Sequence, residues 1–246
     1  MSFDACAAIV ERGDPDRFLA TMAAPPQARR VLFPLYAFNV EVSRAPWVTE
    51  EPMIAEMRLQ WWRDALDEIA EGRPVRSHEV TTPLAEVLDP DGARALDALV
   101  AARRWDVYKD AFEDEGHLHE YLTATGGALM WQAARAMGAA ASAQADVVRF
   151  GTAVAAARFL RAVPALEAAG RVPLLDGRPQ GIAALARMAL QNAKRPRLPK
   201  QAEAATLEGW EAAPVLRQIT KAPQRVADGT VGLAPFRSKL RLLLWS

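Results

Sequence analysis

Three aspartates in one short stretch have the spacing of a metal site. Asp106, Asp110 and Asp114 follow one another at intervals of four residues. On a continuous helix such residues share one face, so their carboxylates would stack along it. Carboxylate oxygens are the ligands that Mg²⁺ prefers in proteins. A second interpretation stays open, because the acidic residues and the glycine nearby also fit a fraying helix end beside a loop.

The histidines and the single cysteine do not add a second metal site. His117 and His119 are two residues apart, a spacing that separates them on a helix, and His78 has no ligand partner near it in sequence. Cys6 alone excludes an internal disulfide and fits a reducing compartment. The sequence lacks a nucleophile elbow, a phosphate-binding glycine loop and a dinucleotide fingerprint. We therefore expect no cofactor unless the aspartates hold Mg²⁺.

The elements that carry these residues have helical periodicity, and no segment alternates as a strand would. Helix starts are predicted at 14–15, 25–26 and 89–90, where prolines with preceding Asp or Pro residues fit a first turn. Longer helices are predicted over residues 49–70, 94–112, 117–137 and 142–169. The fold class is therefore predicted to be all-α, with one domain over residues 1–246.

The helix expected over residues 49–70 has a clear apolar stripe. The stripe consists of Ile54, Met57, Trp61, Ala65 and Ile69. Thr49 is expected to cap the start of this helix, and Gly72 and Pro74 to end it. We expect this stripe to face the core.

Charge and hydropathy exclude several classes of protein. Lys plus Arg and Asp plus Glu are each 30, so no net charge attracts a nucleic acid. The first residues do not resemble a signal peptide, which favours a cytoplasmic location. The most apolar stretch, residues 147–166, is interrupted by Arg149, Arg158 and Arg161, so a membrane-spanning helix is not expected.

Two segments near the C-terminus leave alternatives open. Residues 194–200, KRPRLPK, fit an exposed connection or a contact with a partner or lipid. Residues 233–246, LAPFRSKLRLLLWS, mix large apolar and basic side chains. This composition fits an interfacial helix on the inner face of a membrane, and it fits a core-docked terminal helix equally well.

Three segments in order carry a family resemblance. They are PLYAFNVEVSRAPW at 34–47, RLQWWRDALDEI at 58–69 and FLRAVPALEAAGRVPL at 159–174. Together with YLTATGGALMWQAARAMG at 121–138, the chain resembles the squalene/phytoene synthase family. The resemblance implies an isoprenoid synthase fold, in which helices surround a central apolar cavity capped by two facing aspartate-rich helices. Active members condense two prenyl diphosphates head to head, using Mg²⁺ held by the aspartates.

The first aspartate motif of that family is broken here. Tyr36 and Phe38 match its aromatic beginning. Ser43 and Trp47 stand where its outer two metal-binding aspartates belong, and Arg44 takes the middle acidic place. A tryptophan cannot bind magnesium, and we expect the Trp47 indole to fill part of the cavity instead.

The second motif is broken as well. Arg161 and Arg171 match the family pattern, but Ala162 and Leu166 replace its two aspartates, and Arg158 replaces an asparagine. Hard cations do not survive the loss of nearly every oxygen donor. The departure resembles a non-catalytic branch related to the mitochondrial complex I assembly factor of squalene/phytoene synthase type.

The resemblance thus implies a binding or assembly protein without catalysis, whose partner is a protein subunit or an isoprenoid lipid. Residues expected to line the cavity or contact a ligand are Tyr36, Phe38, Ser43, Trp47, Arg158, Arg161 and Arg171. The two arginines on the second motif helix would contact an anionic group or pair with carboxylates such as Glu41. The alternative is an active prenyltransferase whose metal site has moved to the aspartates at 106, 110 and 114.

Overall fold

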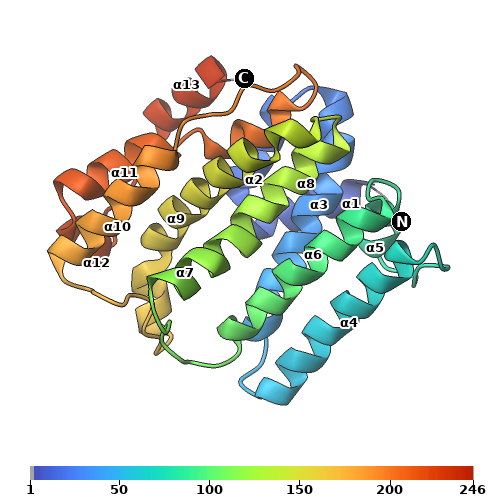
Figure 1. Ribbon diagram of the computed structural model, residues 1–246, viewed down its shortest axis with the longest axis horizontal. Coiled ribbons are helices and arrows are strands. Elements are labelled where there is room, and N and C mark those ends of the chain that lie inside the picture. The colour runs from blue at the N-terminus through green and yellow to red at the C-terminus, as the bar shows by residue number, and fades with distance from the viewer. Residues whose placement is uncertain (1–2, 246) are drawn as a thin grey trace.

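The chain folds into helices arranged around one long central helix (Figure 1). The structure, a computed structural model, describes residues 3–245, and no strand occurs among them. The long helices in chain order are α1 (Phe3–Gly13), α2 (Pro15–Ala23), α3 (Pro26–Arg44), α4 (Pro52–Ala70), α6 (Pro90–Ala102), α7 (Glu115–Leu122), α8 (Ala128–Ala136), α9 (Gln144–Ala168), α10 (Pro179–Asn192), α11 (Ala212–Lys221) and α13 (Pro235–Trp245). Shorter elements are η1 (Ala45–Trp47), α5 (Thr81–Ala85), η2 (Arg103–Asp106), the π-helical turn η3 (Thr123–Gly127), η4 (Ala141–Ala143), η5 (Glu203–Gly209) and α12 (Gln224–Ala227). Buried apolar side chains from α1 to α13 form one core, which confirms the all-α, single-domain prediction.

Side-chain caps and prolines fix the starts of several helices. The Asp14 carboxylate accepts a hydrogen bond from the Arg17 backbone N–H, and Asp89 accepts one from Gly92. Prolines occupy the first turns of α2, α3 and α6, where their missing N–H costs nothing. The helix starts predicted at 14–15, 25–26 and 89–90 are therefore confirmed.

Close backbone packing joins η3 to α9. A Cβ added to Gly127 would lie 2.9 Å from the Val148 carbonyl oxygen, and one added to Gly151 would lie 2.9 Å from the Gly127 Cα. A Cβ added to Gly126 would collide with Ala155. Only small residues permit helix backbones to approach this closely. This contact holds the turn η3 directly on the N-terminal half of α9.

The prediction for residues 49–70 was partly wrong. The helix α4 begins at Pro52, and the Thr49 hydroxyl instead accepts from the backbone N–H of Glu51 before the helix. Ala65 and Ile69 are buried as expected, but Ile54 and Met57 are exposed and Trp61 is only partly buried. The helix turns Ala55, Leu59, Trp62 and Leu66 inward instead. The reason is that α4 lies at the edge of the molecule and packs mainly against α6, so that its first turns project into solvent (Figure 1).

Other boundaries follow the sequence prediction more closely. The helix predicted over 142–169 is α9, and Gly138, with φ of 88°, ends the helix that precedes it. The segment predicted as helix over 117–137 is α7 and α8 with η3 between them. Residues 194–200 form a connection without helix, as predicted, but the segment is only partly exposed, since Pro196 is buried. Among residues 3–245 no helix has the length and apolar character needed to cross a membrane.

Candidate functional site

The predicted aspartate stripe does not form. The helix predicted over 94–112 ends at Ala102, and the chain from 107 to 114 is irregular. Asp106 is buried, where it pairs with Arg103 at 3.1 Å and accepts from the Tyr121 hydroxyl at 3.0 Å. Asp110 is exposed, while Asp114 caps α7 through the His117 N–H. The three carboxylates have separate structural environments, so the relocated metal site is not supported.

A buried ion network links α2, α9 and η5. Arg17 on α2 donates from Nε to the Glu208 carboxylate at 2.6 Å and from Nη1 to Asp14 at 2.9 Å. Arg158 on α9 donates from Nη1 to the same Asp14 oxygen, Oδ2, at 2.9 Å. The Glu208 side chain is only 1% exposed, and that of Arg17 is 9% exposed. Two guanidinium groups thus neutralise two carboxylates inside the protein.

The network shifts the pKa values of Asp14 and Arg17. Burial alone would raise the pKa of Asp14, but the Arg158 and Arg17 guanidinium groups outweigh it and hold that pKa well below its usual range. Burial lowers and the Glu208 and Asp14 charges raise the pKa of Arg17, with a net increase. Asp14 and Arg17 therefore stay ionised at neutral pH, and their pairing is an electrostatic cross-link.

Tyr36 belongs to the same cluster, whereas Phe38 does not. The Arg17 guanidinium lies 5.2 Å from the centre of the buried Tyr36 ring, and the tyrosine hydroxyl has no hydrogen bond among the described residues. Burial and the Glu208 charge raise the pKa of Tyr36 well above its ordinary value. Phe38 is buried on another side of α3, with its ring against Trp62. Tyr36 on α3 and Arg158 on α9 thus both contact the ion network formed by α2 and η5.

Arg161 makes a second, more exposed set of ion pairs. Its Nη1 lies 3.1 Å from Asp16 and 3.2 Å from Glu211. Of the two alternatives for the arginines of this helix, the structure shows pairing with carboxylates, which come from distant segments. The expected partner Glu41 was wrong, since it pairs with Arg44. A cavity of about 10 Å³, large enough for about one water molecule, lies beside Arg161 and Arg158.

Arg171 connects the end of α9 to η1 and η2. The buried guanidinium lies 4.5 Å from the centre of the Trp47 ring and 5.5 Å from that of Trp105. It donates to the backbone carbonyls of Trp105, Asp106 and Tyr108. Trp47 is 45% exposed, so its indole covers Arg171 at the surface, and the prediction that it fills an interior cavity was wrong. Arg171 is a structural cross-link in this arrangement.

The four positions that carry metal-binding aspartates in the family motifs supply no oxygen donors that converge on one point. Ser43 donates its hydroxyl to the Val40 carbonyl at 3.0 Å, and Trp47 covers Arg171. Ala162 is exposed and Leu166 is partly buried against the core. Within residues 3–245, no group of three or more His, Cys, Asp or Glu side chains is arranged to hold a metal ion.

An open apolar groove lies on the other half of α9. It has a volume of about 1210 Å³ and is bounded by α7, η3, α9 and α10. Its apolar lining includes Leu118, Leu122, Val148, Ala156, Leu174, Leu175, Ile182, Leu185 and Met188. Polar groups at its edges include Glu115, His119, Arg149, Asp176, Gln180 and Asn192. A mostly apolar groove with a few polar groups is the usual form of a ligand site.

None of the seven site residues predicted from the sequence lines this groove. The prediction followed the aspartate motifs, which lie toward the C-terminal ends of α3 and α9. A usable signal lay in the segment YLTATGG at 121–127, whose small residues let η3 approach α9 and whose Leu122 and Thr123 line the groove. The contribution of α10 had no distinctive motif.

Comparisons with known proteins agree with the fold described above. The family model for squalene/phytoene synthase matches residues 10–176, which is more than half of the chain. A solved dehydrosqualene synthase in complex with ligand superposes with a TM-score of 0.79 at 15% identity, covering 99% of this chain and 94% of that one. The squalene synthase HpnC from Alicyclobacillus acidocaldarius gives 0.63 at 14% identity, covering 99% and 90%. These two structures show the shared fold.

Curated relatives are more similar in sequence over shorter segments. A Drosophila melanogaster protein named NADH dehydrogenase (ubiquinone) complex I, assembly factor 6 homolog is 38% identical over 132 residues, 51% of this chain. The Homo sapiens protein of the corresponding name is 30% identical over 64 residues, 26% of this chain. These matches span 39% and 19% of the relatives' own lengths.

Proposed function

The chain belongs to the squalene/phytoene synthase family, and we propose that it is a non-catalytic member that binds a partner in the assembly of respiratory complex I. One observation carries the non-catalytic part of the proposal. The positions of both metal motifs hold Ser43 with Trp47 and Ala162 with Leu166, none of which has a carboxylate. Without Mg²⁺ at these positions, nothing would neutralise the diphosphate leaving group of a prenyl donor.

The assembly part of the proposal is supported by the relatives named as complex I assembly factors. The groove between α7, α9 and α10 is the proposed binding site, because its apolar lining can bury a long hydrophobic segment or chain. Its occupant is an isoprenoid lipid or an apolar segment of a partner protein. A peripheral contact with the inner face of a membrane through the C-terminal segment would place the chain beside a membrane complex.

Turnover assays test the non-catalytic part. Purified protein is incubated with farnesyl or geranylgeranyl diphosphate and Mg²⁺, beside an active squalene synthase as positive control. We expect no diphosphate release and no head-to-head product. Diphosphate release above the no-enzyme rate would contradict the proposal.

Genetic complementation tests the assembly part. The gene is deleted in the source organism, and assembled complex I is measured by native gel and NADH oxidation in membranes. We expect a loss of the complex that the wild-type gene restores. Restoration is expected to fail for Ala184→Trp, which fills the groove from α10, and to succeed for Ala162→Trp, which changes another exposed alanine outside the groove. A normal level of complex I in the deletion strain would overturn the assembly role.

A further inference from the structure

The last helix, α13, presents large apolar side chains to solvent. Phe236 is 76% exposed and Leu244 is 79% exposed, and Leu240 and Leu243 are exposed beside them. Exposed apolar side chains in a contiguous group mark a contact surface more often than chance exposure does. Packing against the core therefore does not account for these apolar side chains of α13.

The opposite side of α13 attaches it to the body of the protein. Leu242 is buried, the Ser238 hydroxyl accepts a hydrogen bond from the Trp210 indole N–H, and the Trp245 ring lies 6.2 Å from that of Phe150. Arg195, from the connection at 194–199, donates to the Trp245 carbonyl at 2.7 Å. The orientation of the helix is thus fixed by its own contacts, with the apolar stripe outward.

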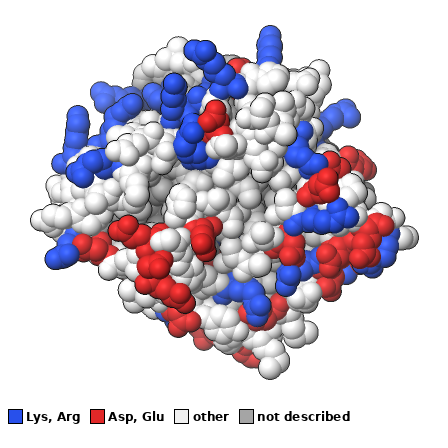
Figure 2. All heavy atoms as spheres, in the orientation of Figure 1, with Lys and Arg blue, Asp and Glu red and all other residues white. Residues whose placement is uncertain are grey.

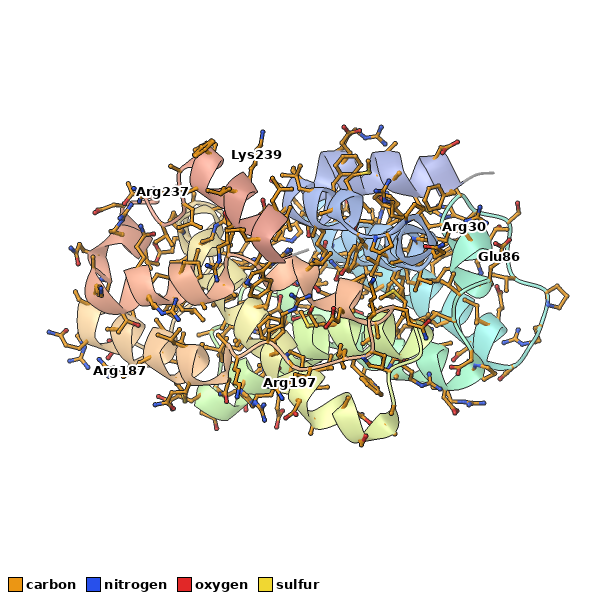
Figure 3. The ribbon with its side chains drawn as sticks, turned by 90° about the horizontal axis from the view of Figure 1, so that it is seen from above. Arg30, Glu86, Arg187, Arg197, Arg237 and Lys239 are labelled. Carbon is orange, nitrogen blue, oxygen red and sulfur yellow. The ribbon has the colours of Figure 1, made fainter. Side chains whose placement is uncertain are left out.

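Cations flank the exposed stripe on both sides. At 100° per residue, Lys239 falls on one edge of the stripe formed by Phe236, Leu240 and Leu243, and Arg237 falls on the other. Both cations are exposed, and Figure 3 shows their side chains projecting away from the molecule. Residues 235–245 contain no acidic side chain. An apolar stripe between two basic edges is the pattern of a helix that lies in a membrane interface.

Basic residues are also concentrated in the C-terminal part of the chain, which includes α13. Residues 187–246 contain 11 Lys and Arg but only four Asp and Glu, although the complete chain has equal numbers of both. In Figure 2 the basic side chains gather toward the top of the face, where α13 lies in Figure 1, and most acidic side chains lie lower. This polarity would turn the α13 side toward a negatively charged surface and the acidic side away from it.

We infer that α13 docks the protein on a bilayer that contains anionic phospholipids. Phe236, Leu240, Leu243 and Leu244 enter the boundary between head groups and acyl chains, and Arg237 and Lys239 contact lipid phosphates at its edges. This inference rests on the peripheral location proposed above and adds the element, its orientation and the lipid charge. It does not depend on what fills the groove.

Co-sedimentation of the full chain with lipid vesicles tests the inference. We expect binding to phosphatidylcholine vesicles that contain 30 mole per cent phosphatidylglycerol, and much weaker binding to pure phosphatidylcholine. Arg237→Gln with Lys239→Gln should lower the binding constant about 25-fold, since each cation near an anionic surface contributes about fivefold. Phe236→Ser with Leu244→Ser should lower it on the order of 100-fold, because two large side chains no longer leave water.

Matched variants elsewhere provide the controls. Arg30→Gln with Arg58→Gln removes the same charge from exposed positions on α3 and α4, outside the basic C-terminal segment, and Met53→Ser with Met57→Ser removes exposed apolar side chains from α4. Both controls should bind vesicles as the wild type does, and so should the groove variant Ala184→Trp. Equal losses in the controls would overturn the inference, because they would show nonspecific attraction.

Two further outcomes would also overturn it. The first is equal binding of the wild type to anionic and neutral vesicles, which would remove the role of the cations. The second is a stable dimer in sedimentation that Phe236→Ser with Leu244→Ser dissociates, combined with no vesicle binding, which would assign the α13 stripe to a second copy of the chain. Failure of vesicle binding with intact complementation would reject the α13 inference alone.

Discussion

The two halves of α9 have opposite surroundings. In the C-terminal half, which we call the closed half, Arg158 and Arg161 form ion pairs with carboxylates from α2, η5 and the start of α11, and only a cavity of about 10 Å³ lies beside them. Toward its N-terminal end, Val148, Thr152 and Ala156 border an open groove of about 1210 Å³. The half that carries the second metal motif in the enzymes of the family has become a structural cross-link. The other half, which we call the open half, borders a space that a ligand can enter.

The difference between the two halves predicts that a substitution in the ion network of the closed half lowers the stability of the protein strongly. Glu208→Gln leaves the buried Arg17 without its closest anionic partner and should lower the free energy of unfolding by about 3–5 kcal/mol. Chemical denaturation monitored by circular dichroism measures the effect. Glu203→Gln, in the same element but exposed, is the matched control and should change stability by less than about 0.5 kcal/mol. A small loss for Glu208→Gln would mean that the network is not a cross-link.

Acidification should weaken the closed half through Asp14. Its folded-state pKa is depressed, so its contribution to stability is complete above the unfolded pKa of about 3.9 and is lost as the pH falls below that value. Asp14→Asn keeps the cap of α2 but removes the charge, and should cost about 1–3 kcal/mol at pH 7. The difference in unfolding free energy between wild type and variant should shrink between pH 4 and pH 2. A constant difference over that range would contradict the assignment.

A substitution in the groove of the open half should instead weaken ligand binding and leave stability nearly unchanged. Ala184→Trp adds an indole to the groove from an exposed position on α10, so stability should change by no more than about 0.5 kcal/mol. Binding of radiolabelled farnesol, measured by equilibrium dialysis, should fall at least about tenfold if the indole occupies the site. The control Ala162→Trp should leave farnesol binding unchanged. If the wild type does not bind farnesol, the isoprenoid occupant is rejected and the partner protein remains.

The sequence predicted the fold better than the site because the two depend on different kinds of information. Caps, prolines and periodicity are local, so the starts at 14–15 and 89–90 and the extent of α9 followed directly. The partner of Arg17 is Glu208, 191 residues away in sequence, and nothing local connects them. The exposed start of α4 was missed because an apolar stripe does not reveal that the helix extends beyond its neighbour. The groove was missed because its walls meet only in the folded chain.

The smallest effect is expected from restoring carboxylates at the second metal motif, on α9. Ala162→Asp with Leu166→Asp places two carboxylates four residues apart on α9, as in the aspartate-rich motif. We expect no Mg²⁺-dependent rise in the melting temperature and no release of diphosphate from farnesyl diphosphate. The reason is that position 162 faces solvent, while Ser43 and Trp47 supply no carboxylate from the other motif. Mg²⁺ needs several oxygen ligands converging on one point, and two exposed aspartates on one helix do not provide them. Diphosphate release by this variant would show that the enzyme site is still assembled, and that only two residues separate this chain from catalysis.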